Sequence, residues 1–197
     1  MKLKGIDYLD ISGHFSEEEI MTQHNTRDFV EKEINPIIDE YFRDGKFPKE
    51  LIPKFADMGF LGINLPTEFG GGGMSNIAYG LVCQELERCD SGIRSFVSVQ
   101  GSLVIYPIFA YGSDEQKKKW LPKLTSGEAI GCFGLTEPDF GSNPGGMQTK
   151  AVKVDGGYKI SGTKMWITNG SIADIAIVWA KTEDGLVRGF IVEQGIR

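Results

Sequence analysis

The spacing of apolar residues predicts helices over the first two-thirds of the chain. A capping box at Ser16–Glu19 begins a segment whose apolar residues recur at helical spacing to about Phe42. Pro36 lies inside this segment, so we expect a kink or a break there. A second helix is expected to begin at Pro48 and to stop at Gly59.

Three further helical segments follow. Ser75 is the expected cap of a helix to about Cys89, and the positions expected to face inward are Ile77, Leu81, Val82, Cys83 and Leu86. The run Ile93–Tyr111 carries almost no charge beyond Arg94, which predicts a buried central helix. Ser113 begins a short helix through Leu121, which Pro122 is expected to help end.

After residue 128 the pattern changes to that of strands. The segments expected to be extended are Phe60–Pro66 in the first part of the chain and, in the second, Ala129–Thr136, Lys150–Val154, Tyr158–Ile160, Lys164–Thr168, Ile172–Lys181 and Leu186–Glu193. The predicted fold class is α+β, with an N-terminal all-helical domain (residues 1–127) followed by an incomplete antiparallel β-barrel-like domain (residues 128–197). So few antiparallel strands need closure or a partner to cover their edges.

Composition and charge exclude several classes of protein. The chain has 197 residues and a net charge of −6 without a basic stripe, which argues against nucleic-acid binding. Its three cysteines and two histidines show no CxxC or HxxxH spacing, so we expect reduced thiols and no metal site. No stretch approaches the ~18 consecutive apolar residues of a membrane span, and no signal or transit pattern begins the chain. A soluble, cytoplasmic protein without a membrane span is expected.

Two segments carry candidate chemistry, Cys132–Asn143 and Lys164–Asn169. The first leaves a strand into a Gly-Ser loop whose backbone N–H groups and Ser142 hydroxyl could hold a phosphate or the edge of a flavin. In the second, strand alternation would place Lys164, Trp166 and Thr168 on one face, where Trp166 offers a stacking wall and Thr168 a hydroxyl to an isoalloxazine ring. Trp166 alone is more readily an ordinary core residue, but together the two segments favour a flavin site.

This pair of segments resembles the signature pair of the acyl-CoA dehydrogenase family. The matching letters are "CFGLTEPDFGSN" and "GTKMWITNG", supported by "LGINLPTEFGGGGMS" and "YGSDEQKKKWLPKLTSGE". The resemblance covers essentially all 197 residues. Asn143 departs from the Asp that the family usually has there, which puts a local cap in doubt rather than the flavin site.

The resemblance implies the cofactor FAD and a reaction that removes a proton α to a thioester carbonyl while hydride passes from the β-carbon to the flavin. It assigns flavin contacts to Phe133, Gly134, Leu135, Thr136, Ser142, Trp166, Ile167 and Thr168. Ser142 is also assigned to the CoA, and the electrons are expected to pass to an electron-transfer flavoprotein.

The segment "ELERCDSGIRSFVSVQGSLVIYPIFAYGS" is similar to the glutaryl-CoA dehydrogenase branch. Arg94 is a lone cation in a nearly uncharged run, so it either pairs with a local acid such as Glu87 or Asp90, or it receives the distal carboxylate of a dicarboxylyl thioester. The branch uses an Arg-Ser pair at this place, which assigns substrate binding to Arg94 and Ser95, with Glu87 as an active-site carboxylate. The implied reaction converts glutaryl-CoA to glutaconyl-CoA and then to crotonyl-CoA.

The family's catalytic base is a Glu in a C-terminal helical domain that also completes the FAD site across a subunit interface. That domain is missing here, so no catalytic residue is expected in this chain and the base is expected beyond Arg197. The chain resembles a truncated portion of a usually tetrameric enzyme, inactive alone. Two alternatives stay open: a short- or branched-chain acyl-CoA dehydrogenase in which Arg94 is structural, and a non-catalytic acyl-CoA-binding or assembly module.

Overall fold

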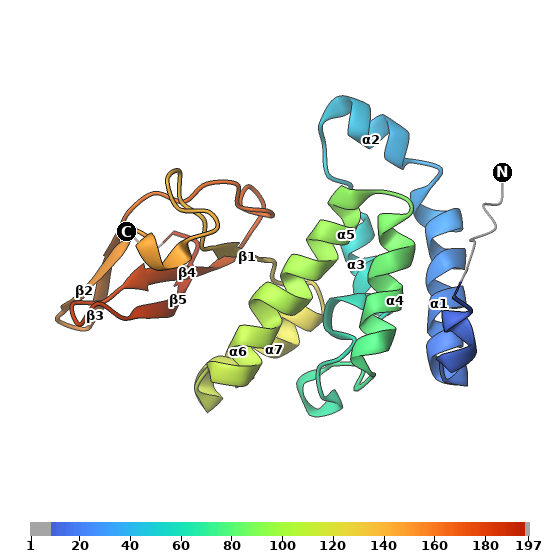
Figure 1. Cartoon of the computed structure of the whole chain (residues 1–197), viewed down its shortest axis with the longest axis horizontal. Coiled ribbons are helices and arrows are strands. Elements are labelled where there is room, and N and C mark those ends of the chain that lie inside the picture. Colours follow the sequence, from blue (N-terminus) through green and yellow to red (C-terminus); the bar gives the residue numbers. More distant parts are fainter. Residues whose placement is uncertain (1–8, 196–197) are drawn as a thin grey trace.

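The computed structural model describes residues 9–195, and it contains a helical part followed by a sheet (Figure 1). The helices are α1 Glu17–Phe29, α2 Ile38–Asp44, α3 Leu51–Asp57, α4 Asn76–Glu87, α5 Ser91–Ser98, α6 Tyr106–Tyr111 and α7 Asp114–Thr125. The strands are β1 Gly131–Gly134, β2 Lys150–Val154, β3 Gly157–Ser161, β4 Ile175–Lys181 and β5 Val187–Glu193. The prediction of a helical domain followed by a partial sheet is confirmed.

The capping residues begin helices as the sequence indicates. The Ser16 hydroxyl accepts from the Glu19 N–H while the Glu19 carboxylate accepts from the Ser16 N–H, which satisfies two N-terminal donors of α1. The same carboxylate also accepts from the hydroxyl of Ser75, the cap of α4, and so ties the two helix starts together. The expected break occurs at Pro36, between the π-helical segment Val30–Ile34 and α2.

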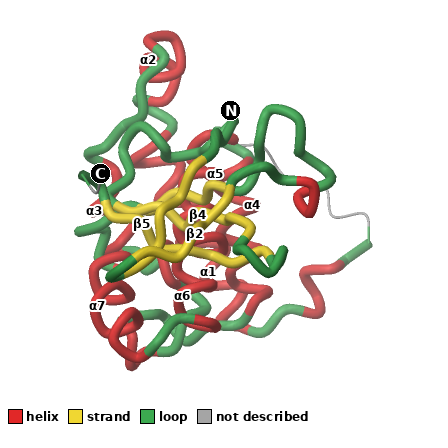
Figure 2. Tube along the Cα trace, turned by 90° about the vertical axis from the view of Figure 1, so that its left-hand side faces the viewer, coloured by secondary structure: helices red, strands yellow, loops and turns green. Residues whose placement is uncertain are grey.

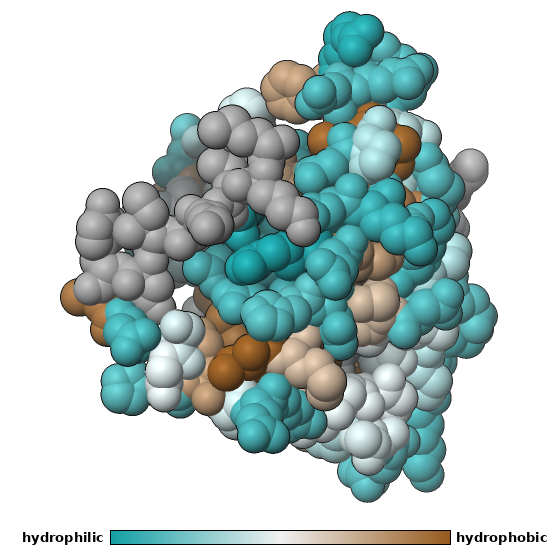
Figure 3. All heavy atoms as spheres, turned by 90° about the vertical axis from the view of Figure 1, so that its right-hand side faces the viewer, coloured by the Kyte–Doolittle hydropathy of each residue, from teal (hydrophilic) through white to brown (hydrophobic). Residues whose placement is uncertain are grey.

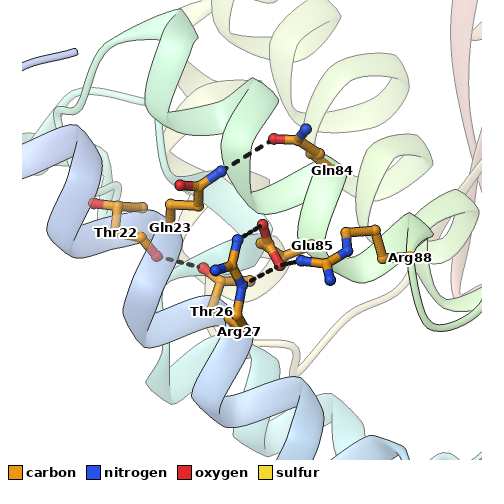
Figure 4. A network of polar contacts seen from close by, with 7 residues as sticks. All are labelled: Thr22, Gln23, Thr26, Arg27, Gln84, Glu85 and Arg88. Atoms are coloured by element: carbon orange, nitrogen blue, oxygen red, sulfur yellow. Dashed lines mark hydrogen bonds and ion pairs between the residues drawn. The ribbon is translucent and has the colours of Figure 1, made fainter. Parts of the chain in front are cut away.

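A buried ion cluster joins α1 to α4 (Figure 4). Glu85 is 2% exposed and accepts two hydrogen bonds from Arg27, at 3.0 and 2.7 Å, and a third from Arg88 at 2.8 Å. Two guanidinium groups therefore compensate a carboxylate that would be costly to bury alone. The outer face of this helical part, over α1, is largely hydrophilic (Figure 3), as expected where α1 carries its acidic residues.

Ser91–Tyr111 forms a continuous helical run in which the π-helical segment Val99–Ile105 joins α5 to α6. By length and composition alone it is also the one run among residues 9–195 that could cross a membrane. However, its side chains Phe96, Val97, Val104, Ile105 and Ile108 are buried within the fold, as in the core helix of a folded domain. The expected central helix is present.

Gln100 joins this central helix to the sheet. It is fully buried, donates to the carbonyls of Leu124 and Ala129 at 2.9 Å each, and accepts from the N–H of Gly131 at 2.8 Å. Its amide nitrogen and oxygen are therefore both paired at the point where the chain passes from α7 into β1. The start of β1 is thereby fixed against the central helix.

The sheet lies against one side of the helical part (Figures 1 and 2), where β1 and β4 contact the π-helical segment Val99–Ile105. Ile175 and Ile177 of β4 share a buried cluster with Val104, Ile108 and Leu121. The strand order is β1-β4-β2-β3, and β5 pairs with the other side of β4. The sheet is thus held to the helices by one continuous apolar layer.

The sheet is open and mixed, which corrects the expectation of an antiparallel, barrel-like arrangement. β1 pairs with β4 in parallel, and β2 meets β4 in parallel at Lys150–Lys181, whereas β2–β3 and β4–β5 are antiparallel. Parallel pairing requires a long crossover, and the segment between β1 and β4, which includes the β2–β3 hairpin, provides it. Strand spacing along the sequence does not reveal such a non-local pairing.

Other local predictions also differ from the structure. Residues 60–66 form a 3-10 helix and turns rather than a strand, with Gly59 in the left-handed region before them. Pro122 lies inside α7, which continues to Thr125 because its last turn buries Leu121 and Leu124. Ile77 is half exposed rather than inward-facing, and residues 164–168 are not a strand.

Candidate active site

A cavity of about 240 Å³ lies where the central helix meets the loop after β1 and the loop before β4. Its lining residues are Val99, Leu103, Phe133, Leu135, Thr136, Trp166, Ile167 and Thr168. Six of these eight are residues that the family resemblance assigns to a flavin. A larger apolar cavity, of about 550 Å³ between α6 and β5, contains none of the predicted site residues.

The two signature segments are joined directly by hydrogen bonds. The backbone N–H of Met165 donates to the carbonyl of Thr136 at 2.9 Å, and the Lys164 ammonium donates to the carbonyl of Leu135 at 3.0 Å. At the far end of the second segment, the Asn169 side chain donates to the carbonyl of Gly131. The expected convergence of the two segments is therefore present in the structure.

Trp166 lines the cavity, but its backbone is not part of the expected strand. Its backbone lies in the left-handed region, with φ +60°, and its side chain is 82% exposed. Lys164 is instead largely buried, so Lys164 and Trp166 do not share one face. A left-handed conformation is strained for a bulky residue, and such strain is concentrated at functional sites.

The cavity lining suits a flat, largely apolar ring with polar edges. No Asp, Glu, Lys or Arg lines it among the residues that the structure describes. Apolar side chains and the exposed Trp166 indole offer stacking surface, and the hydroxyls of Thr136 and Thr168 offer hydrogen bonds. These residues fit an isoalloxazine ring, whose polar edge needs donors and acceptors while its faces need apolar contact.

Next to the signature residues of the cavity in the sequence, Glu137 and Lys164 form a buried ion pair, with the ammonium 2.9 Å from the carboxylate. Glu137 also accepts from the backbone N–H groups of Gln148 and Thr149 and from the Thr149 hydroxyl. Burial raises the pKa of the Glu137 carboxyl, but the hydrogen bonds from Thr149, Gln148 and Lys164 outweigh it and lower that pKa to about 2.

Arg94 and Glu87, the expected substrate residues, face each other on α5 and α4. The Arg94 Nε donates to the Glu87 carboxylate, which also accepts from Ser91, and an Arg94 Nη donates to Ser98 at 3.3 Å. The guanidinium group of Arg94 lowers the pKa of Glu87, and Glu87 in turn raises that of Arg94. The structure therefore shows the local pairing that was one of the two possibilities for Arg94.

The remaining site residues lie in different surroundings. Ser95 lines a neighbouring cavity of about 420 Å³ that shares Thr168 with the first, so it lies on the same side of the molecule as the candidate flavin site. Gly134 is buried in β1 between two lining residues. Ser142 is exposed in the loop before the 3-10 turn Pro144–Gly146 and does not line either cavity.

The sequence-based site omits Val99 and Leu103, which form the helical wall of the cavity. Their spacing of four places them on one face of the central helix, and this apolar pair is the only signal that the sequence offers. The buried partnership of Glu137 with Lys164 also had no sequence signal, because it depends on how two distant loops fold.

The chain matches two family profiles in succession: residues 16–128 match the acyl-CoA dehydrogenase N-terminal domain and residues 132–196 match the acyl-CoA dehydrogenase middle domain. It is 38% identical over 185 residues to an acyl-CoA dehydrogenase of Bacillus subtilis (strain 168), covering 92% of this chain and 49% of that protein. It is 38% identical over 166 residues to the human mitochondrial short-chain specific acyl-CoA dehydrogenase, covering 84% of this chain and 40% of that protein.

Solved structures give the same picture. A glutaryl-CoA dehydrogenase from Mycobacterium smegmatis in complex with FADH2 superposes with a TM-score of 0.91 at 48% identity, covering 94% of this chain and 48% of that one. The butyryl-CoA dehydrogenase of Megasphaera elsdenii superposes with a TM-score of 0.86 at 34% identity, covering 96% of this chain and 50% of that one. The chain thus spans about half the length of the relatives that it matches. Its two domain matches, its fold and the expected convergence of its two signature segments show that it belongs to the FAD-dependent acyl-CoA dehydrogenase family.

Proposed function

We propose that this chain supplies the flavin cradle and part of the substrate site of an enzyme that dehydrogenates an acyl-CoA thioester between its α- and β-carbons. The observation that carries this proposal is the cavity in which Thr136, Trp166 and Thr168 meet. FAD, when bound, supplies the hydride acceptor. The protein's task is to hold the ring and the substrate in register and to exclude water.

Each flavin residue has a role that follows from its position. Phe133, Leu135 and Ile167 give apolar contact, and Thr136 and Thr168 offer hydroxyls at the edge of the ring. Trp166 provides a flat face that is accessible to the ring, because its indole is exposed and not packed in the core. We assign Gly134, which lies between two lining residues, a backbone contact with the ring, and we assign Ser142, which is exposed on its loop, to the nucleotide side of FAD or to the CoA.

The base that removes the α-proton is proposed to lie outside residues 9–195. The support is that no carboxylate from the described chain lines the cavity. Glu87 is held by Arg94 and Ser91 and does not line that cavity, so it is a poor candidate for a free base. We further propose a cytoplasmic homotetramer that passes its electrons to an electron-transfer flavoprotein.

We infer that the substrate is glutaryl-CoA, which is converted to glutaconyl-CoA and then to crotonyl-CoA. Two M. smegmatis glutaryl-CoA dehydrogenase structures are 48% and 51% identical to this chain, against 38% for the human short-chain enzyme. Arg94 is about one-third exposed beside Ser95, so its guanidinium can receive a carboxylate in a bidentate geometry. Glu87, its present partner, would then compete with the distal carboxylate of the substrate for the same group.

A short- or branched-chain acyl-CoA dehydrogenase is the second candidate. It is favoured by one observation, that Arg94 is already paired with Glu87 and Ser98 and so has a structural role without any substrate. In that case Arg94 would not discriminate between acyl chains.

The visible spectrum of the intact gene product tests both the proposed flavin and the proposed substrate. We expect a flavin band that bleaches with glutaryl-CoA, and we expect Arg94→Gln to weaken glutaryl-CoA binding roughly 10–100-fold, the effect of losing a charged hydrogen bond, while butyryl-CoA binding stays unchanged. Equal effects on both thioesters would favour the short-chain candidate. A protein that holds no flavin would contradict the proposed function as a whole.

A further inference from the structure

A buried ion pair is connected to the wall of the candidate flavin cavity without lining it, because Glu137 follows Thr136 in the chain and Lys164 donates to the Leu135 carbonyl. The Glu137 side chain is 4% exposed and that of Lys164 is 13% exposed. Neither residue belongs to the cavity wall. Glu137 follows Thr136, which lines the cavity, and Lys164 precedes Met165, whose N–H donates to the Thr136 carbonyl. The pair is therefore placed to act through its neighbours and not by contact with a ligand.

The pair connects three separate segments of the chain. Lys164 donates to the Glu137 carboxylate at 2.9 Å and to the Leu135 carbonyl at 3.0 Å. The carboxylate is held in turn by the N–H groups of Gln148 at 2.6 Å and Thr149 at 2.9 Å, the two residues that immediately precede β2. The loop that carries Trp166 is thus fastened to the loop after β1 and to the sheet.

The need for such a fastening is visible at Trp166 itself. Its left-handed backbone is unfavourable for a bulky residue, and its 82% exposed indole has little packing that could hold the conformation. A strained conformation persists only where the surrounding structure over-determines it. On the N-terminal side of Trp166, the conformation is held by the Met165–Thr136 hydrogen bond and by the ion pair of Lys164 with Glu137.

We propose that Glu137 and Lys164 are positioning residues that hold Trp166 in its left-handed conformation, so that its indole stands ready to stack on the flavin ring. This inference rests on the proposed function, because the flavin is the ligand for which the indole is held. Removing the Glu137–Lys164 ion pair should leave the cavity residues present but wrongly arranged. A purely structural ion pair would affect stability and leave flavin affinity unchanged.

A charge-neutral double variant separates these two possibilities. Removing one partner leaves a buried charge uncompensated, which destabilises any fold, whereas removing both avoids that effect. Glu137→Gln combined with Lys164→Met should therefore fold. We expect it to bind FAD at least tenfold more weakly than the wild type, measured by titration of flavin fluorescence in the intact gene product.

The controls are a conservative variant and a remote ion pair. Lys164→Arg keeps the charge and the donors, and we expect its FAD affinity to stay within about threefold of the wild type, because a guanidinium can still reach the carboxylate. Asp184→Asn breaks the exposed pair between the β4–β5 turn and Arg188 of β5 and should leave FAD affinity unchanged.

Hydrogen exchange at the Met165 amide gives a readout that does not involve flavin. This amide donates to Thr136, and we expect its exchange to accelerate at least tenfold in the double variant while amides in β4 keep their protection. Wild-type FAD affinity together with unchanged Met165 exchange in the double variant would overturn the inference alone. A wild-type protein that binds no FAD would overturn the proposed function and the inference with it.

Discussion

The backbone N–H of Met165 donates to the carbonyl of Thr136 at 2.9 Å, and this bond joins the two segments that carry the family signature. Trp166, Ile167 and Thr168 follow Met165 in the chain, and Phe133 and Leu135 precede Thr136. All five line one cavity. The flavin cradle that we propose for this chain depends on that junction.

Trp166→Gly should leave the fold intact. The indole is 82% exposed and so contributes little burial, and glycine relieves a left-handed conformation that strains other residues by about 1–3 kcal/mol. We expect the free energy of unfolding in urea to stay within about 1 kcal/mol of the wild type, because glycine also adds chain entropy of about 0.5–1 kcal/mol.

Trp120→Ala is the matched control for this change. Trp120 is 8% exposed in the apolar cluster beside the sheet, so its truncation should destabilise the fold by about 3–5 kcal/mol. If both variants lost stability equally, the Trp166 side chain would have to be packed, contrary to the structure.

Gln100→Leu should destabilise the fold strongly although it adds an apolar side chain to the interior. It removes the acceptor of the Gly131 N–H and the donor to two carbonyls, and each buried group left unpaired costs about 1–3 kcal/mol. Urea unfolding followed by circular dichroism measures the loss. Gln84→Leu is the control, because the Gln84 side chain is exposed and accepts a hydrogen bond from the Gln23 side chain at the surface, and we expect it to change stability little.

Glu85→Ala should weaken the contact between α1 and α4. The variant leaves Arg27 and Arg88 facing each other without the carboxylate that joins them (Figure 4). We expect a loss of about 2–3 kcal/mol, below the 3–5 kcal/mol typical of a fully buried pair, because both guanidinium groups are about one-third exposed. Asp44→Ala, which breaks the exposed pair with Lys46, should have a much smaller effect, and an equal effect would show that Glu85 is not buried as the structure has it.

Stability should depend on pH through Glu137. Its folded pKa of about 2 lies below the ordinary value of 4.5, so the ionised carboxylate stabilises the fold fully above pH 4.5, and this contribution is lost as the pH falls from about 4.5 towards 2. Glu137→Gln lacks that titration. We expect the wild type to lose more stability than the variant between pH 5 and 3 in urea unfolding, whereas parallel losses would show that Glu137 does not titrate in this way.

Much of the fold could be predicted from the sequence because its signals are local. Ser16, Ser75 and Ser113 begin helices as their spacing to downstream residues indicates, and Pro36 interrupts the first helical segment. The turn between β2 and β3 likewise follows from its glycines, since Gly156 adopts a positive φ there. These features depend on interactions within a few residues.

The parts that sequence patterns miss depend on contacts between distant segments. The alternation of Lys164, Trp166 and Thr168 suggested a strand, but the Lys164 side chain turns inward to Glu137 and the backbone at Trp166 becomes left-handed. The parallel pairing of β1 with β4 is equally non-local. The resemblance to a family indicated six of the eight residues that line the cavity, together with Ser142, which does not line it, whereas only the structure shows how the lining residues are held there.

Titration of the intact gene product with FAD, followed by quenching of flavin fluorescence, tests the central claim most directly when the wild type is compared with Trp166→Gly. Stacking of a ring on an aromatic side chain contributes about 1–3 kcal/mol, so we expect saturable binding by the wild type and roughly 10–100-fold weaker binding by the variant. Equal affinity in the two proteins, or no saturable binding by the wild type, would contradict the account.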